Sequence, residues 1–206
     1  MKKNIDKMKL LAVFSLTTLI FVLGILLGNF LSNQKLENID EIQQELRTDT
    51  MALETEYLLL SQEPCHETKT NVLTDELYQI NSKIDYMENT LGEKIKEVLK
   101  LKDFYSLLEM RHWLLLKKIQ GECGGNYTFI HYFYYNNDDC PECKDQGFIL
   151  LYIRKKFDNV RIYSYDINND NFAVNALKKI YGIKKAPSVI IDDKVIEGFI
   201  TKDQVE

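Results

Sequence analysis

The longest hydrophobic segment of the chain lies near its amino terminus. Residues 10–31 are almost all apolar and include no charged side chain. At about 1.5 Å per residue, a helix of this length crosses the roughly 30 Å hydrocarbon core of a bilayer. A cleaved signal peptide has an apolar region of roughly 7–15 residues that ends in small residues, and this run is longer and ends differently. The pattern favours an uncleaved transmembrane anchor over a signal peptide.

Charges on either side of this run predict its orientation. Four lysines and one aspartate lie within residues 1–9, whereas the segment after the run is mainly acidic. The positive-inside rule places the lysine-rich side in the cytoplasm. We therefore expect a single-pass protein of the cell membrane with a cytoplasmic amino terminus, residues 1–9, and with residues 32–206 on the outer side.

A seven-residue apolar repeat follows the hydrophobic run. One of its positions is always apolar and the other is mixed: Ile39, Leu46, Leu53 and Leu60 occupy the first, and Leu36, Gln43, Thr50 and Tyr57 the second. This spacing is typical of a helix that packs along a partner, because an unpartnered stripe would leave apolar side chains in water. The partner is either another helix of the same chain or a second copy in a coiled coil, and the short repeat fits both.

Two further apolar stripes, at residues 73–91 and 95–108, predict more helix. Pro64 should end the first helix, because proline lacks an amide hydrogen and disfavours helical geometry in the residue before it. The stripes change phase near Gly92, and Thr90 and Glu93 have the spacing of a capping box, which predicts a bend and a new helix. The alternative is one long helix that tolerates the glycine at a cost of about 1 kcal/mol. Residues 32–120 are thus expected to form a helical stalk, either a hairpin or a coiled coil.

The shape of the stalk decides whether Cys65 and Cys123 can meet. In one straight helix over residues 70–118 they would lie roughly 70 Å apart. In a hairpin that bends near Gly92, both cysteines return to the same end, and a structural disulfide becomes geometrically feasible. The spacing leaves open whether they pair with each other, remain reduced or pair with another chain.

The hydrophobic pattern changes after residues 121–126, where three glycines suggest a hinge. Residues 127–135 are aromatic and β-branched, as expected for a buried strand. We then expect a helix at 146–157, a strand at 160–167, a helix at 171–181, and two strands at 188–191 and 194–197 joined by an Asp192-Asp193 turn. Residues 121–206 should therefore form an α/β domain of order β-α-β-α-β-β with a short last helix, which leaves one face of the sheet for the stalk to cover.

Charge and cysteine spacing narrow down the chemistry of this domain. No segment after the apolar run is basic enough for a nucleic-acid surface. Cys140-Pro141-Glu142-Cys143 stands between the first predicted strand and the first predicted helix. Cys140 at a helix amino terminus would be the nucleophile, because unpaired amides and the helix dipole favour its thiolate. Cys143 lies one turn later and could attack a mixed disulfide to release the substrate.

This arrangement resembles the thioredoxin superfamily over residues 126–206. The resemblance rests on Cys140-Pro141-Glu142-Cys143, on Ala186-Pro187-Ser188 and on Gly198, in that order. It implies a thioredoxin-like fold, a cis bond before Pro187 that faces the dithiol, and backbone hydrogen bonds from Ala186 to an extended substrate.

The sequence departs from this family in two ways. Asp138 and Asp139 stand where many thioredoxins have an aromatic residue, and their negative charge should oppose formation of a thiolate at Cys140. The buried acid that the family has on its first strand is absent from residues 129–135. Both departures predict a weaker or differently tuned redox couple.

Zinc binding and a purely structural disulfide compete with the redox interpretation. Cys-Pro-x-Cys is also half of a zinc knuckle, but the remaining candidate ligands show no second knuckle spacing; these are Cys65, His66, His112, Cys123 and His131. A structural Cys140–Cys143 disulfide would gain little stability from so short a loop. His131 alternates with apolar residues in a predicted strand and is interpreted as a packed side chain. We therefore expect neither a metal nor a cofactor.

Two functions remain open at this point. The first is a membrane-anchored thiol–disulfide oxidoreductase that acts through Cys140 and Cys143 on exported proteins or on a membrane redox partner. The second is a non-catalytic interaction or scaffold protein, built from a coiled coil and a thioredoxin-like domain. The stalk could form a homo-oligomer in either case. Oxidases, isomerases and reductases share such a dithiol and differ in its reduction potential.

Overall fold

The structure, a computed structural model, describes residues 7–65, 70–92, 95–136 and 140–205, without the side chains of residues 33–40, 43 and 70–72. It divides into two compact units, Met1–Glu45 and Leu46–Glu206. Helix α1 (Lys7–Gln62) contributes to both units. Within the first unit, the segment Lys7–Ser32 is helical, exposed, and long and apolar enough to cross a membrane.

In the second unit, the end of α1 packs against two further helices, α2 (Thr70–Leu91) and α3 (Lys96–Cys123). The heptad residues Leu46, Leu53, Tyr57 and Leu60 are buried. Polar contacts cross the same interfaces: Lys83 pairs with Asp49, Arg111 with Glu54, and the ammonium of Lys118 donates to the carbonyl of Ser61. This part of the heptad stripe is therefore covered within the chain, and a homo-oligomer through it remains only a prediction.

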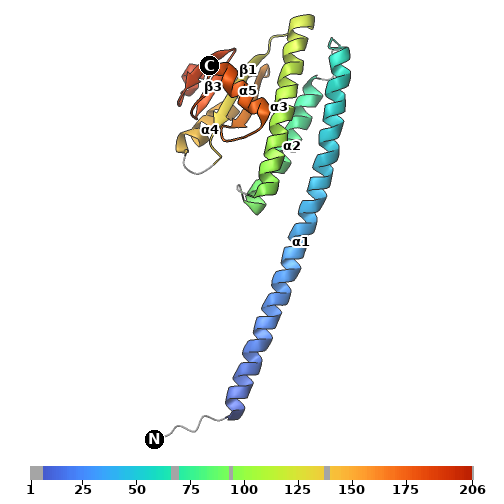
Figure 1. Ribbon diagram of the computed structural model, residues 1–206, viewed down its shortest axis with the longest axis vertical. Helices are drawn as coiled ribbons and strands as arrows, with labels where there is room; N and C mark the ends of the chain where they lie inside the picture. The colour runs from blue at the N-terminus through green and yellow to red at the C-terminus, as the bar shows by residue number, and fades with distance from the viewer. Residues whose placement is uncertain (1–6, 66–69, 93–94, 137–139, 206) are drawn as a thin grey trace. The chain divides into compact units, whose positions relative to one another are not determined.

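The predicted bend near Gly92 is present, whereas the predicted helix start is wrong. Helix α2 ends at Leu91, and Gly92 has φ +108°, a conformation that residues with a Cβ rarely adopt. Figure 1 shows α2 and α3 beside each other, as expected for a hairpin. Thr90 lies in the last turn of α2, where its hydroxyl donates to the carbonyl of Tyr86. Helix α3 begins at Lys96 without a side-chain cap. A threonine in a last turn can satisfy a carbonyl of its own helix; Glu93 lies outside the described residues.

A disulfide closes the open end of this hairpin. Cys65 and Cys123 are bonded, with their Cα atoms 5.3 Å apart. Helix α3 continues through Gly121 as far as Cys123, so the predicted hinge at residues 121–126 begins too early. A single glycine in a helix costs only about 1 kcal/mol, and packing of the preceding turns offsets this cost. The helix instead ends at Cys123, and its C-cap residue, Gly124, has φ +78°.

Replacing both Cys65 and Cys123 by serine should lower the free energy of unfolding by about 4 kcal/mol, because the bond closes a loop with a sequence separation of 58 residues. Urea unfolding of the full chain in detergent micelles, followed through the fluorescence of its single tryptophan, Trp113, measures this change. The matched control replaces Cys140 and Cys143, whose sequence separation is 3 and whose loss should cost much less. Equal losses in the two variants would contradict the prediction.

After residue 126 the chain forms a four-stranded mixed sheet in the order β2-β1-β3-β4. Strand β1 (Thr128–Tyr134) pairs parallel with β2 (Val160–Asp166) and antiparallel with β3 (Ser188–Ile191), which pairs with β4 (Lys194–Glu197). Helix α4 (Pro141–Lys156) makes the crossover that two parallel strands require, and α5 (Phe172–Tyr181) joins β2 to β3. The predicted order of elements is present, with a short last helix, α6 (Lys202–Val205).

The turn between β3 and β4 is the one that the sequence predicts. Asp192 and Asp193 both have positive φ, at 45° and 71°. Two-residue hairpin turns with positive φ at both positions match the twist of the strands, and aspartate tolerates this conformation better than most residues.

The two faces of the sheet are covered by different parts of the chain. On one face, Ile130 and Tyr132 of β1 form a core with Leu150 and Ile153 of α4. The intervening residue His131 faces the other way, where its ring lies 4.6 Å from that of Trp113 on α3. Because α3 also packs against β2, a helix of the predicted stalk covers this second face.

Candidate functional site

The candidate dithiol lies at the amino terminus of α4. Cys140 is the N-cap residue, Pro141 occupies the first turn, and Cys140 and Cys143 form a disulfide with Cα atoms 5.2 Å apart. The helix therefore begins at Pro141, five residues before the predicted start at 146. Proline is preorganised for a first helical turn, and Glu142 in the same turn complements the helix dipole. Asp138 and Asp139 lie outside the described residues.

Hydrogen bonds to β1 and to the carboxy-terminal segment hold the start of α4, which carries the dithiol. The backbone amide of Cys143 donates to the carbonyl of Cys140 at 3.1 Å, and the hydroxyl of Tyr132 on β1 donates to the carbonyl of Cys143. One turn further, the side-chain carbonyl of Gln146 accepts from the amide of Ile200 at 2.8 Å. Cys140 is 8% and Cys143 5% exposed. The start of α4 is thus fixed both to the central strand and to the carboxy-terminal segment.

The segment Ala186-Pro187 lies at the same end of the sheet. The bond between these residues is cis, and Pro187 is buried. Phe133 pairs with Ser188, so the start of β3 lies beside the end of β1, from which the chain continues to Cys140. The amide of Gly198 donates to the carbonyl of Pro187 at 2.8 Å. The three sequence elements behind the family resemblance therefore gather at one end of the sheet.

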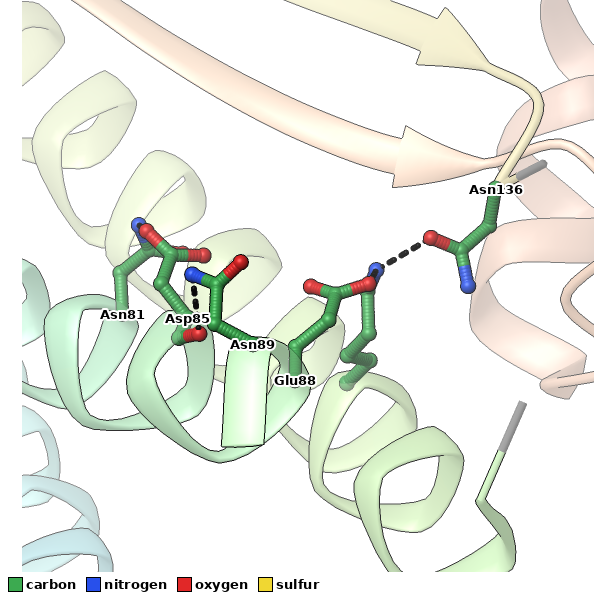
Figure 2. Close-up of polar contacts among 6 residues, drawn as sticks. Asn81, Asp85, Glu88, Asn89 and Asn136 are labelled. Atoms are coloured by element: carbon green, nitrogen blue, oxygen red, sulfur yellow. Dashed lines mark hydrogen bonds and ion pairs between the residues drawn. The ribbon is translucent and has the colours of Figure 1, made fainter. Parts of the chain in front are cut away.

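A half-buried lysine links the helical hairpin to the loop before the dithiol (Figure 2). The ammonium of Lys102 on α3 donates to the carboxylate of Glu88 on α2 at 2.8 Å and to the side-chain carbonyl of Asn136. Lys102 and Glu88 are only 17% and 16% exposed. Asn136 follows β1 and precedes Cys140 by four residues. Cys65 and Cys123, by contrast, lie at the other end of α3, roughly 30 Å from Lys102 along the helix, and are not part of this site.

A buried acid reaches the edge of the sheet from α3. Glu109 is 3% exposed, and one of its carboxyl oxygens accepts from the amide of Ser164 on the edge strand β2 at 3.0 Å. The other oxygen, Oε2, has no hydrogen-bond partner among the described residues. Burial raises the pKa of Glu109 well above its usual range, against a lowering by the Ser164 amide. Burial therefore favours the protonated form of Glu109, which lies on α3 and not on the first strand of the sheet.

Two buried histidines of this part of the structure have lowered pKa values and are neutral at pH 7. His112 contacts the hydroxyl of Thr74 through Nε2, at 3.1 Å, and that of Tyr163 through Nδ1, at 3.0 Å. Burial and the positive charge of Arg161 lower the pKa of His112 to about 3. His131 stacks on the rings of Tyr163 and Tyr165, and burial is the main reason that its pKa is lowered to about 4. The interpretation of His131 as a packed side chain is confirmed.

Glu109 and Lys102 were not predicted from the sequence as site residues, and His112 was considered only as a zinc ligand. One signal for two of them is present: Glu109 and His112 interrupt the buried stripe of α3 that includes Leu108, Leu115 and Leu116. Polar residues on a buried face need partners, and here the partners are supplied by β2 and α2.

Two of the remaining zinc candidates, Cys65 and Cys123, are used in a disulfide. His66 lies outside the described residues. Within the part of the chain that the structure describes, no group of three or more His, Cys, Asp or Glu side chains could hold a metal ion.

A cleft of about 1020 Å³ is lined by Cys143 of the dithiol and by residues of the hairpin; Cys140 is not among its lining residues. Its walls come from α2, α3 and α4, and the strands β1 and β2 contribute tyrosines. The lining side chains include Asn81, Asp85, Glu88, Asn89, Asp103, Glu109, Tyr132 and Cys143. A volume at the upper end of the range for small-molecule pockets leaves room for several residues of a bound polypeptide.

The site therefore combines a disulfide at a helix amino terminus with an adjoining polar cleft. Such an arrangement can exchange disulfides, since a thiolate at this position is favoured and its partner thiol lies one turn away. A scan against protein-family models and a search of curated proteins found no match for this chain.

Proposed function

We propose that the protein is a membrane-anchored thiol–disulfide oxidoreductase that uses Cys140 and Cys143. The observation that carries this proposal is the Cys140–Cys143 disulfide at the amino terminus of α4. In the reduced protein, the helix dipole and the unpaired amides favour the thiolate of Cys140. This thiolate attacks a substrate disulfide, the substrate S–S bond breaks, and the departing substrate thiolate takes up a proton. Cys143 then attacks the mixed disulfide and releases the second substrate thiol, and the reverse sequence oxidises a dithiol substrate.

The fold supports a thioredoxin-like domain over residues 126–206. Strand β1 leads to the dithiol, α4 follows it, and β3 and β4 form an antiparallel hairpin on the other side of β1. Cys140, Ala186-Pro187 and Gly198 gather at one end of the sheet. Because this end carries the amino terminus of α4, an extended substrate that passes Ala186 would reach the sulfur of Cys140.

The proposed place of action is the outer face of the membrane. Support comes from the apolar helix Lys7–Ser32, from the lysines that precede it, and from the pairing of all four cysteines in disulfides, which persist in oxidising compartments. The substrates would be exported proteins with thiols or disulfides, and a membrane redox partner would renew the dithiol.

The test is equilibration of the full chain, in lipid nanodiscs, with buffers of graded thiol-to-disulfide ratio, followed by alkylation and mass spectrometry. We expect Cys140 and Cys143 to be reduced and reoxidised together and reversibly. Cys65–Cys123 should stay oxidised at ratios that reduce the dithiol, because structural disulfides have lower reduction potentials. If neither Cys140 nor Cys143 can be oxidised reversibly, the oxidoreductase proposal is wrong.

The burial of both cysteines favours a second candidate, a non-catalytic interaction protein. At 8% and 5% exposure, Cys140 and Cys143 offer little surface to a protein substrate. This candidate predicts no turnover of disulfides, together with partner binding that survives replacement of both cysteines by serine. Turnover by the full chain above the rate of the double variant would rule it out.

A further inference from the structure

One wall of the cleft beside the dithiol is formed by carboxylates and carboxamides of α2. Figure 2 shows Asn81, Asp85, Glu88 and Asn89 along this helix. The amide nitrogen of Asn81 donates to the carboxylate of Asp85 at 3.1 Å, and that of Asn89 to the backbone carbonyl of Asp85 at 2.9 Å. These residues follow one another at helical spacing and all line the cleft.

Among the described residues that line the cleft, seven carry a carboxyl group and four carry a cationic group. Asp85 is exposed as a residue, but partial burial of its carboxylate and the neighbouring Glu88 raise its pKa, although Lys102 lowers it. Across the cleft, burial together with Asp166 and Asp170 raises the pKa of Asp103. The cations of the cleft already have other contacts: Lys102 binds Glu88 and Asn136, for example, and Arg154 lies over the ring of Tyr78. A cationic ligand would relieve this excess.

A second, independent feature of the cleft indicates a ligand. Glu109 lines the cleft and is only 3% exposed, and its Oε2 has no hydrogen-bond partner among the described residues. A buried polar atom without a partner costs roughly 1–3 kcal/mol. A ligand that carries a carbonyl oxygen would remove this cost, because a protonated carboxyl group can donate to it.

We propose that this cleft binds the polypeptide segment that flanks the reactive cysteine of the substrate, and that it selects segments with lysine or arginine. Asp85 pairs with the basic side chain, whereas Asn81, Asn89 and Glu109 hydrogen-bond to the peptide backbone. Cys143 lines the same cleft, so a bound segment lies next to the dithiol. The proposal rests on the oxidoreductase function and specifies its substrate class.

The test uses the full chain with Cys143→Ser, which cannot resolve a mixed disulfide. Three reagents carry the same coloured aromatic thiol in a disulfide: a peptide with lysines beside its cysteine, the same peptide with glutamates, and a small uncharged thiol. Attack by Cys140 on the peptide sulfur forms the mixed disulfide, breaks the reagent S–S bond and releases the coloured thiolate. After division by the rate with the small reagent, we expect the lysine peptide to react about tenfold faster than the glutamate peptide.

Two variants locate the source of this preference. Asp85→Asn should remove most of it. Asp145→Asn is the matched control, because Asp145 is an exposed carboxylate two residues from Cys143 that does not line the cleft, and it should keep the preference. Glu109→Met should lower the reaction rates of both peptides but not that of the small reagent. Glu109→Gln keeps a hydrogen-bond donor and should leave the rates of both peptides unchanged.

The possible failures are distinguishable. Equal rates for the two peptides, or a preference that Asp85→Asn leaves intact, would overturn the cleft proposal while the dithiol function stands. A preference that Asp145→Asn reduces as much as Asp85→Asn would show only long-range attraction and would also overturn it. No reaction of Cys140 with the small reagent would reject the oxidoreductase function, and this inference with it. Because Asp85 is exposed, its variant should fold even if Glu109→Met does not.

Discussion

Replacing Cys140 by serine should abolish turnover of a disulfide substrate by the full chain. The first chemical step is attack by the Cys140 thiolate, and a serine hydroxyl cannot form a mixed disulfide. Cys140 occupies the N-cap position of α4, where the helix dipole favours the thiolate, so no other cysteine should replace it. The measurement is the rate of reduction of a peptide disulfide at a fixed concentration of an external thiol.

The other cysteines provide the controls for this experiment. Cys143→Ser should stop turnover after the first step and accumulate a mixed disulfide on Cys140. The Cys65→Ser/Cys123→Ser variant should keep its turnover at temperatures where it remains folded, because that disulfide lies at the other end of α3. Substantial activity in Cys140→Ser would contradict the assigned nucleophile.

Acidification should destabilise the wild-type protein through His112, relative to a His112→Gln variant. Burial and the positive charge of Arg161 lower the pKa of His112 to about 3 in the folded state, whereas an unfolded histidine titrates near pH 6.5. Between these values the unfolded chain binds a proton that the folded chain does not, so stability falls as the pH falls. The slope for one proton is about 1.4 kcal/mol per pH unit, and the accumulated loss should reach several kcal/mol.

Urea unfolding of both proteins between pH 7.5 and pH 4, followed through Trp113, measures this difference. Above pH 7 it should be constant, because histidine is neutral in both states. Other titrating groups are common to the two proteins and largely cancel in the comparison. A difference that stays constant down to pH 4 would show that the folded protein protonates His112 as easily as the unfolded one.

Local chemistry made much of the fold predictable. The strands at 188–191 and 194–197 and their aspartate turn follow from β-branched runs separated by residues that tolerate positive φ. The end of α1 before Pro64 follows from the missing amide hydrogen of proline. Two of the wrong boundaries, at Thr90 and at Gly121, fall where a local signal is weaker than the packing of the whole helix.

The polar part of the site was not predictable in the same way. Glu109 meets Ser164 from 55 residues away, and His112 meets Tyr163 from 51 residues away. Such pairs depend on how α3 lies against β2, which periodicity within α3 does not encode. The positions of Cys140 and Cys143 were predictable, because a single strand–turn–helix segment contains both the motif and the elements that orient it.

The placement of α3 has a consequence for how the unit Leu46–Glu206 unfolds. This helix forms one half of the hairpin and also covers the second face of the sheet, where its Trp113 meets His131. A fragment that begins at residue 121 would leave that aromatic face in water, and a hairpin without the sheet would lose the β2 partners of Glu109 and His112. The helical and α/β parts should therefore melt in one cooperative transition. A substitution that destabilises either part should then lower the melting temperature of both.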